Sequence, residues 1–494
     1  MGTEDDTGVV FRRAEDGSRS TSAVGRAVVT AALRDVDPAG ALAAERETNW
    51  RSGYLDHVAQ LTVAGLSSRD GAVAIARDGL AAVHAHMRVV DDGGDEHDLD
   101  VLRTLEPDAV PATEVVRGDA DPEEELVLAY RGEQLRGDAL AGQLDRWVAD
   151  GILEPSAAES VREVMAHPEW LRLDGRTVVV LGAGAEMGPL PALLRWGATV
   201  AGVDLRRPEL WRRVLDTARR GAGTLLVPVD EPGDQDGRPL EERAGLDLIR
   251  EVPATAEWIA GLEGTAPVLG NYVYADGATH VRAAVAVDAL TCRVHASRPD
   301  VALAFLATPT DVFAVPASDV DKATAAYEGR SRTAKLMARP LRTLSAGRLL
   351  RRGYAPGVDP GICDALVPQQ GPNYALAKRI HRWRATVARA DGGVVSLHVA
   401  PATRTRSVMK NRALAAAYAG AHRFGVEIFD PDTTNTLMAA LLVADLHHGG
   451  GPTLTHVWQE EAHAAVHGGL WTCPYGPRSA LGLAALLGLS GARS

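Results

Sequence analysis

The stretch from residue 177 to residue 204 restricts the fold of this chain more than any other part of the sequence. The β-branched and apolar run Thr177 to Leu181 comes directly before a glycine-rich turn, and an apolar segment from Leu190 to Trp196 follows the turn. A second β-branched run then ends at Asp204. This pattern predicts a strand, a tight turn, a helix and a second strand. Because strands that alternate with helices form parallel sheets, we predict an α/β fold with a doubly wound parallel sheet.

Glycines within the turn suit the binding of nucleotide phosphates. Gly182, Gly184 and Gly188 have no side chain, so the backbone can approach a pyrophosphate at the N-terminus of the following helix, where free N–H groups and the helix dipole favour anions. Asp204 lies about 20 residues further on, where a carboxylate can bind ribose hydroxyls. The sequence therefore predicts a dinucleotide site of the Rossmann type. The alternative is a tight turn between strand and helix that binds no ligand.

The end of the second predicted strand bears on the choice between NAD and NADP. Asp204 favours a free ribose 2′-hydroxyl and so NAD, whereas Arg206 and Arg207 could meet a 2′-phosphate or serve as solvated surface charges. Glu186 and Met187 lie inside the turn and are expected beside the phosphates. The Glu186 carboxylate would repel a pyrophosphate unless its side chain turns away or meets a cation. We predict NAD or NADP as the cofactor, with a slight preference for NAD.

A second motif pairs Tyr374 with Lys378 in a chain that contains very little lysine. Only Lys322, Lys335, Lys378 and Lys410 are lysines among the 52 basic residues. Side chains four residues apart share one face of a helix, so the Lys378 ammonium could draw the pKa of the Tyr374 phenol from about 10 toward neutrality. Such a phenol donates or accepts a proton at a carbonyl or alcohol oxygen. The alternative is an amphipathic helix in which the tyrosine packs and the lysine is solvated.

In their order along the chain, these segments resemble the short-chain dehydrogenase/reductase superfamily between residues 174 and 445. The glycine turn is similar to the family's Thr-Gly-x-x-x-Gly-x-Gly turn, with Leu181 in place of the threonine and Glu186 in place of the middle glycine. Tyr374 and Lys378 match the family's catalytic pair. Three more segments look like landmarks of the family. Residues 268–271 are similar to the strand before its Asn-Asn-Ala-Gly segment, and residues 301–310 to the strand that ends in its catalytic serine. Residues 394–403 are similar to the later strand with its Pro-Gly loop, with Ala402 in place of the glycine.

The resemblance implies a set of site residues. Thr308 or Thr310 would replace the catalytic serine, and the sequence does not choose between them. Lys378 would both lower the pKa of Tyr374 and bind the nicotinamide ribose. Outside the glycine turn, the residues implied beside the cofactor are Asn271, Pro401 and Thr403. The family's relay asparagine has no clear counterpart, because residues 281–290 offer only Asp288 as a polar side chain of similar shape.

From these residues we predict an NAD(P)-dependent oxidoreductase that interconverts a carbonyl and a secondary alcohol through a Tyr/Lys proton-transfer pair. An S-adenosylmethionine-dependent methyltransferase is an alternative, since it also uses a glycine turn and an acid after the second strand, but it gives Tyr374 and Lys378 no role. A non-catalytic nucleotide-binding scaffold is the third reading, and Glu186 with the missing asparagine supports it. The substrate would be a small molecule.

Composition limits the partners and the location. The 494 residues carry a net charge of −13, whereas nucleic acids and anionic membranes attract concentrated positive charge, so we expect neither as a partner. Three cysteines without metal-binding spacing favour a reducing cytoplasm. The N-terminus lacks the pattern of a signal peptide, and no apolar run is long enough for a transmembrane helix. By analogy with enzymes of this fold, we predict a homodimer.

Along the chain we predict three parts. Residues 1–22 are polar and are expected to form a mobile tail, residues 23–170 a mainly helical N-terminal domain, and residues 171–494 the Rossmann-type domain with an insertion at about 317–370. Helices are expected at 72–77, 144–148 and 161–165. The insertion contains the basic run 348–352, whose arginines could bind an anionic substrate or remain solvated.

Two groups of polar residues near the C-terminus are candidate ligand sites. Arg404 and Arg406 follow Pro401 and are candidates for binding an anion beside the cofactor. The spacing of four residues within the pairs His456 with Glu460 and His463 with His467 is one that zinc sites use, but their order matches no known helix-borne zinc signature. We therefore predict no metal site. The aromatic segment 471–477 is expected to pack over the substrate cleft.

Overall fold

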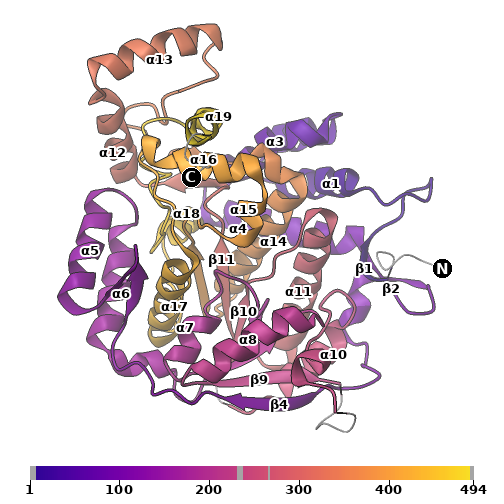
Figure 1. Ribbon diagram of the computed structural model, residues 1–494. Coiled ribbons are helices and arrows are strands. Elements are labelled where there is room, and N and C mark those ends of the chain that lie inside the picture. Colours follow the sequence, from indigo (N-terminus) through magenta and orange to yellow (C-terminus); the bar gives the residue numbers. More distant parts are fainter. Residues whose placement is uncertain (1–6, 231–236, 265–266, 490–494) are drawn as a thin grey trace.

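A sheet of seven strands forms the centre of the computed structural model, which describes residues 7–230, 237–264 and 267–489 (Figure 1). The strand order is β14-β11-β10-β7-β8-β9-β4, and all neighbours are parallel except β4, which runs antiparallel along β9. The strands are β4 (Ala112–Arg117), β7 (Thr177–Leu181), β8 (Thr199–Val203), β9 (Thr224–Val229), β10 (Val268–Asn271), β11 (Ala302–Ala307) and β14 (Val395–Val399). The predicted α/β class with a mostly parallel sheet is confirmed.

Helices cover both faces of this sheet, which explains why its central strands are apolar throughout. All five residues of β7 are buried, as expected for a parallel strand with helices on both sides. One face packs against α10 (Val252–Ala260), α11 (Gly277–Ser297) and α14 (Gly371–Ala390). The other face packs against α7 (Leu190–Arg195), α8 (Pro208–Arg220) and α17 (Pro431–His448). The short α9 (Leu240–Arg243) lies before α10.

Regular secondary structure begins closer to the N-terminus than predicted. Instead of belonging to a mobile tail, Gly8–Phe11 form strand β1, which pairs with β2 (Met87–Val90), and β2 pairs in turn with β3 (Glu96–Asp98). Val9 and Val10 are buried, and the Arg282 guanidinium donates to the carbonyl of Val9 at 2.7 Å. The polar residues around this short apolar run dominated the composition, so the strand was missed. Residues 1–6 lie outside the described residues.

The N-terminal block contributes to both helical layers. Its first helices are α1 (Thr21–Leu33), α2 (Pro38–Glu45), α3 (Trp50–Ala64) and α4 (Arg69–His86), and their buried side chains join the core with α11 and α14. Its last helices, α5 (Gly137–Ala149) and α6 (Pro155–Ala166), join the core of the opposite face. The three helices predicted in this block are confirmed. Between them, however, β4 enters the central sheet and β5 (Leu128–Tyr130) pairs with β6 (Glu133–Leu135).

The predicted insertion extends the molecule beyond the sheet. It contains α12 (Ala317–Glu328), α13 (Arg332–Leu344) and β13 (Gly361–Asp364), which pairs with β12 (Val312–Val315). In Figure 1, α13 is the outermost helix at its end of the molecule. The C-terminal helices are α15 (Arg406–Lys410), α16 (Arg412–Ala421), α18 (Val457–Ala462) and α19 (Pro477–Gly488), and single 3₁₀ turns lie at 99–103, 168–172, 368–370 and 422–424. Within the described ranges, we find no helix with both the length and the apolar character needed to span a bilayer.

Candidate functional site

The glycine turn follows β7 and contacts the segment that follows β10. Gly182 has φ +87°, which is unfavourable for any other residue, and a Cβ atom there would lie 3.0 Å from the carbonyl of Tyr272. The Gly182 N–H donates to the Val203 carbonyl at 2.8 Å. The turn therefore lies at the carboxyl ends of β7, β8 and β10, where open α/β sheets bind ligands.

Asp204 follows β8 and is hydrogen-bonded to the glycine turn. Its Oδ2 atom accepts the Gly184 N–H at 2.9 Å and its Oδ1 atom accepts the Leu205 N–H at 2.8 Å. Burial raises the pKa of Asp204 despite these two bonds. A carboxylate offers about four acceptor positions, so one on each oxygen could still receive a ribose hydroxyl.

Arg206 is held by acidic residues in this structure. Its guanidinium pairs with Glu251 and with Asp230, the latter at 2.8 Å. These contacts raise the pKa of Arg206, with Glu251 as the largest cause. A 2′-phosphate would have to displace one of these carboxylates to bind Arg206, while Arg207 is exposed.

The Glu186 carboxylate pairs with a cation, and such a pair would reduce its repulsion of a phosphate. Its two carboxylate oxygens accept the backbone N–H of Arg406 at 2.7 Å and the Arg406 Nε–H at 2.8 Å. Arg406 is the first residue of α15, after β14, so this pair connects the glycine turn to the start of that helix. Arg404 pairs with Asp430 at 3.2 Å. Neither arginine proposed as an anion ligand is therefore unpaired.

The helix after the glycine turn lies where it was predicted, since α7 runs from Leu190 to Arg195 within the apolar segment Leu190 to Trp196. Pro189 and Pro191 remove N–H donors from its start. Gly188 and Met187 precede it, and the partly buried Met187 side chain packs against the core below. Phosphates at this turn would depend on the N–H groups of the turn itself.

Tyr374 lies at the other side of this edge of the sheet and takes part in a chain of hydrogen bonds. Its hydroxyl donates to Thr308 Oγ1 at 3.0 Å, and the Thr308 and Thr310 hydroxyls are 2.9 Å apart. Thr310 donates to Gln370 Oε1 at 3.0 Å. Both threonines follow β11, so the structure brings both candidates together with Tyr374. Thr308 makes the direct contact, and Thr310 extends the chain to Gln370.

The predicted lowering of the Tyr374 pKa is wrong for this structure. Burial raises the pKa of Tyr374, although its hydrogen bonds to Thr308 and Thr310 oppose that effect. Burial also lowers the pKa of Lys378 to about 8. The effect of the Lys378 charge falls on two buried imidazoles, His280 and His381, whose pKa values are lowered first by burial and then by Lys378. Without a ligand, Tyr374 is therefore a neutral proton donor.

Aromatic residues from α11 and its preceding loop surround Tyr374. The ring of His280 lies 5.5 Å from that of Tyr374, and the ring of Tyr274 lies 6.4 Å from it. Among the residues that the structure describes, neither ring nitrogen of His381 has a hydrogen-bond partner. Asp288, the polar residue weighed for the relay, faces elsewhere, because Arg384 donates to it at 2.6 Å and His84 Nε2 lies 2.7 Å away.

Buried ion pairs fix α14, which carries Tyr374 and Lys378. Asp311, just after Thr310, accepts Arg379 at 3.0 Å and Arg382 at 2.7 Å. Arg382 also binds both oxygens of Glu461 at 2.8 and 2.6 Å. These pairs join α14 to the end of β11 and to α18, so the Tyr374–Thr308 contact has a rigid support.

The remaining predicted cofactor residues lie at the same sheet edge but bond mainly to their neighbours. Asn271, the last residue of β10, is buried and its Oδ1 accepts the Val273 N–H at 3.3 Å. The Thr403 hydroxyl donates to the Pro401 carbonyl at 2.9 Å and lies 2.7 Å from the Thr434 hydroxyl. These contacts shape the loop after β14, and they occupy the Thr403 hydroxyl.

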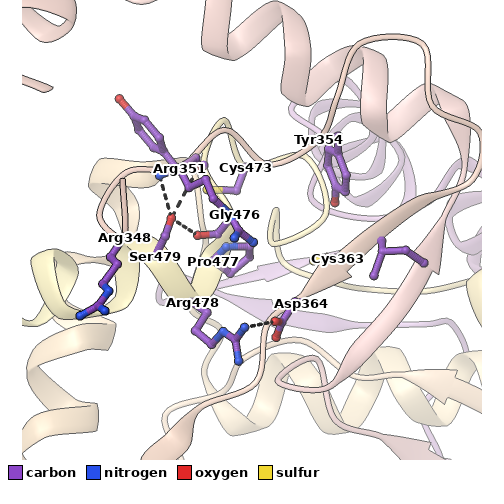
Figure 2. Close-up of a pocket in the computed structure, with 13 residues that line it drawn as sticks. Arg348, Arg351, Tyr354, Cys363, Asp364, Cys473, Gly476, Pro477, Arg478 and Ser479 are labelled. Carbon is purple, nitrogen blue, oxygen red and sulfur yellow. Dashed lines mark hydrogen bonds and ion pairs between the residues drawn. The ribbon is translucent and has the colours of Figure 1, made fainter. Parts of the chain in front are cut away.

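An apolar pocket of about 80 Å³ reaches the Tyr374 hydrogen-bond chain through Thr310 and Gln370. Its other walls are mainly apolar residues of α16, α19 and the segment 365–367, with Tyr418 among them and Arg478 at one side. A second pocket of about 250 Å³ adjoins it, and both contain Cys473, Pro477 and Arg478 (Figure 2). Figure 2 shows Arg478 paired with Asp364 at 2.8 Å. The aromatic segment 471–477 contributes Cys473, Tyr475 and Pro477 to the lining of the second pocket, while Trp471 is fully buried; the place of this segment over a substrate cleft stays a prediction.

The C-terminal histidines do not gather as their spacing suggested. Glu460 pairs with Arg69 and with Arg389, the latter at 3.1 Å. In the described residues, one buried group has ligand atoms close enough for a metal, and it consists of Glu154, Asp319 and His467. His467 Nδ1 accepts the Gly469 N–H at 3.2 Å, so the ring proton belongs on Nε2, which lies 3.3 Å from Glu154.

That tautomer opposes metal binding through Nε2 of His467. Burial raises the pKa of Asp319 to about 7 and also raises that of Glu154, so a protonated carboxyl accounts for the close approach of the two acids.

Sequence reasoning missed Gln370, His280 and His381. Gln370 lies four residues before Tyr374, so helical spacing could have indicated it. The two histidines come from different helices, and only the packing of α11 on α14 brings them together. Neither the models of known protein families nor the curated proteins contain a match to this chain.

Proposed function

We propose that this protein is an NAD(P)-dependent oxidoreductase that interconverts a carbonyl and a secondary alcohol. The observation that carries the proposal is the hydrogen-bonded chain from Tyr374 through Thr308 and Thr310 to Gln370. It lies at the carboxyl edge of the sheet, on the same side as the glycine turn. A neutral phenol held by two hydroxyls is suited to give a proton to a carbonyl oxygen.

The order of the strands supports a Rossmann-type sheet. Taken from the glycine turn onward, the parallel strands follow the order 3-2-1-4-5-6. The order reverses between β7 and β10, where dinucleotides bind in such sheets. Gly182, Gly184 and Asp204 lie at this point, and Asp204 retains acceptor positions for ribose hydroxyls.

In this proposal each residue has one task. When bound, the nicotinamide would supply or accept a hydride at the carbon that bears the reacting oxygen. Tyr374 donates its proton to that oxygen during reduction, and Thr308 orients the phenol. Thr310 and Gln370 fix Thr308, and reorienting the Gln370 amide would reverse the direction of the hydrogen bonds and free the Tyr374 proton. Lys378, whose pKa is about 8, lies on the same helix as a source of positive charge.

The substrate proposed for this site is apolar around its reacting carbon. The pocket that ends at Thr310 and Gln370 is lined mainly by aliphatic side chains of α16 and α19. Burying such a substrate there would be favoured by about 25 cal/mol for each Å² of apolar surface removed from water.

Thermal melting of the purified protein with NADH, NADPH or S-adenosylmethionine tests the cofactor, because a ligand of the folded state raises the melting temperature. A panel of apolar ketones then tests the reaction with Tyr374→Phe. Tyr130→Phe is the matched control, since Tyr130 also donates a hydrogen bond but does so to Glu427 on the opposite face of the sheet. We expect a shift with a nicotinamide cofactor, and a loss of turnover of about a hundredfold or more only in Tyr374→Phe.

A rise in the melting temperature with S-adenosylmethionine alone would refute the dehydrogenase proposal. No shift with any ligand would favour the second candidate, a scaffold of the same fold that binds no nucleotide. The observation in favour of the scaffold is the Glu186–Arg406 pair, which joins the glycine turn to the start of α15.

A further inference from the structure

Helix α13 has no buried face in the part of it that the structure describes. All of its described side chains are exposed, including Leu336 at 68% and Leu344 at 86%. No other helix or strand of the described chain packs extensively against it. Figure 1 shows it standing away from the body at the end opposite to β4 and α8. These leucines belong to one exposed helix, and exposed apolar surface that is grouped on one element is typical of binding surfaces.

The charges of α13 are arranged on one side. Arg332, Lys335, Arg339 and Arg342 follow a spacing of three, four and three residues, which places them along one face of a helix. Leu336, Leu341 and Leu344 fall on the remaining circumference, so the helix is amphipathic. From residue 330 to residue 352 the sequence contains eight basic residues and no acidic one, in a chain of net charge −13.

These cations are largely free of acidic partners. The Lys335 ammonium donates to the Glu328 carbonyl at 2.6 Å, and Arg342 donates to the Tyr327 hydroxyl at 2.7 Å. Within the described residues, none of the four α13 cations makes an ion pair with a carboxylate. Arg352, just beyond the helix, pairs with Glu328 at 3.0 Å.

We propose that α13 docks on the surface of an anionic lipid bilayer. A cationic face beside exposed leucines is the arrangement of helices that lie in the membrane interface, where the leucines enter the acyl boundary and the cations meet lipid phosphates. A nucleic acid would use the cations but leave the leucines in water. The overall charge of −13 argued against anionic membranes, but the requirement is concentrated positive charge, and α13 supplies it locally.

The pocket drawn in Figure 2 lies on the chain leading away from α13, since Arg348 and Arg351 line it. A protein docked through α13 would therefore hold this pocket, and the apolar pocket adjoining it, near the lipid surface. The docking proposal does not depend on the proposed enzymatic function.

Flotation with lipid vesicles tests the docking. The full-length protein is mixed with vesicles of phosphatidylcholine alone, or of phosphatidylcholine and phosphatidylserine in equal parts. Arg332→Glu combined with Arg339→Glu reverses two cations whose side chains form no hydrogen bond or ion pair with the described residues, and Leu336→Ser with Leu344→Ser removes the apolar side. The matched controls are Arg219→Glu with Arg220→Glu on α8, and Val115→Ser on β4, all exposed and on the elements opposite α13.

We expect the wild type and both controls to float with the anionic vesicles and not with the neutral ones. The double charge reversal is expected to weaken this binding by at least about a hundredfold, and the leucine variant by about tenfold or more. Absence of vesicle binding, equal binding to neutral vesicles, or unchanged binding by both α13 variants would overturn the proposal. If instead the wild type is an oligomer that the α13 variants convert to monomers without any vesicle binding, a second copy covers α13 and the lipid proposal is refuted.

Discussion

Replacing Asp311 with alanine is expected to destabilise the protein severely. This buried carboxylate neutralises two buried guanidiniums of α14, Arg379 and Arg382. Arg382 keeps its two bonds to Glu461, but Arg379 loses the carboxylate that pairs with it. The substitution therefore leaves a buried arginine uncompensated on the Tyr374 helix.

The expected cost follows from the loss of one partner in a buried pair, which is about 3–5 kcal/mol. An entropy of unfolding near 2.1 cal/mol/K per residue gives about 1 kcal/mol/K for the 494 residues. The melting temperature should therefore fall by about 3–5 °C. Because an apolar pair replacing a buried ion pair is often neutral, adding Arg379→Met to Asp311→Ala should recover part of the loss.

Differential scanning calorimetry measures both variants against the wild type. Burial alone would raise the pKa of Asp311, but the two guanidiniums outweigh it and the folded pKa is lowered. Asp311 thus adds stability that is fully present above its unfolded pKa near 3.9 and is lost as the pH falls through the folded pKa. The wild type should keep its advantage over Asp311→Ala from neutral pH to about pH 4 and lose it below. A melting temperature within about 1 °C of the wild type at pH 7 would refute the reasoning.

Three further changes have definite outcomes. Lys378→Met should raise the free energy of unfolding at pH 7 by up to about 3 kcal/mol, because burial holds the folded pKa of Lys378 at about 8, below the ordinary value of 10.5. Urea titrations should show this gain vanish above about pH 10, and a loss of stability at pH 7 would contradict it. Gly182→Ala should cost more than Gly132→Ala in the same assay, since both have positive φ but only a Cβ at Gly182 meets backbone, and equal costs would exclude the steric reason. Glu186→Gln should change stability by less than about 1 kcal/mol yet tighten NADH binding in calorimetric titration. The control Asp145→Asn, which removes an exposed pair with Arg162 between α5 and α6, should leave NADH binding unchanged.

The sequence predicted those parts of the fold that depend on local patterns. The run from Thr177 to Leu181 forms a buried strand because its β-branched residues pack on both faces of a parallel sheet. The glycine turn and Asp204 could also be predicted. The turn needs glycine because φ is positive at Gly182, and Asp204 accepts a hydrogen bond from the Gly184 N–H. Strand β4 could not be foreseen, since its place beside β9 depends on pairing between residues about 110 positions apart.

The sequence indicated which residues lie at the candidate site, but it did not indicate the direction of their pKa shifts. Tyr374 meets the threonines because both threonines follow β11 and the start of α14, which carries Tyr374, packs against that end of the strand. The direction of the Tyr374 pKa was wrong, because helical spacing gives the separation of Lys378 along the chain but not the burial of the phenol or the two imidazoles beside the ammonium. Burial and unpaired neighbours are properties of packing, and a pattern of residues along one helix does not contain them.

The Glu186–Arg406 pair is weak evidence for a scaffold over an enzyme, although it lies at the glycine turn. Arg406 is 55% exposed and Glu186 25%, and exposed pairs contribute at most about 1 kcal/mol. Opening the pair would therefore reduce the affinity for a dinucleotide by about fivefold, whereas micromolar binding corresponds to about 8 kcal/mol. Once released, Arg406 could also meet a phosphate and recover that cost. The prolines at the start of α7 remove donors permanently, so the N–H groups of residues 183–188 must supply the phosphate contacts if the site binds a dinucleotide at all.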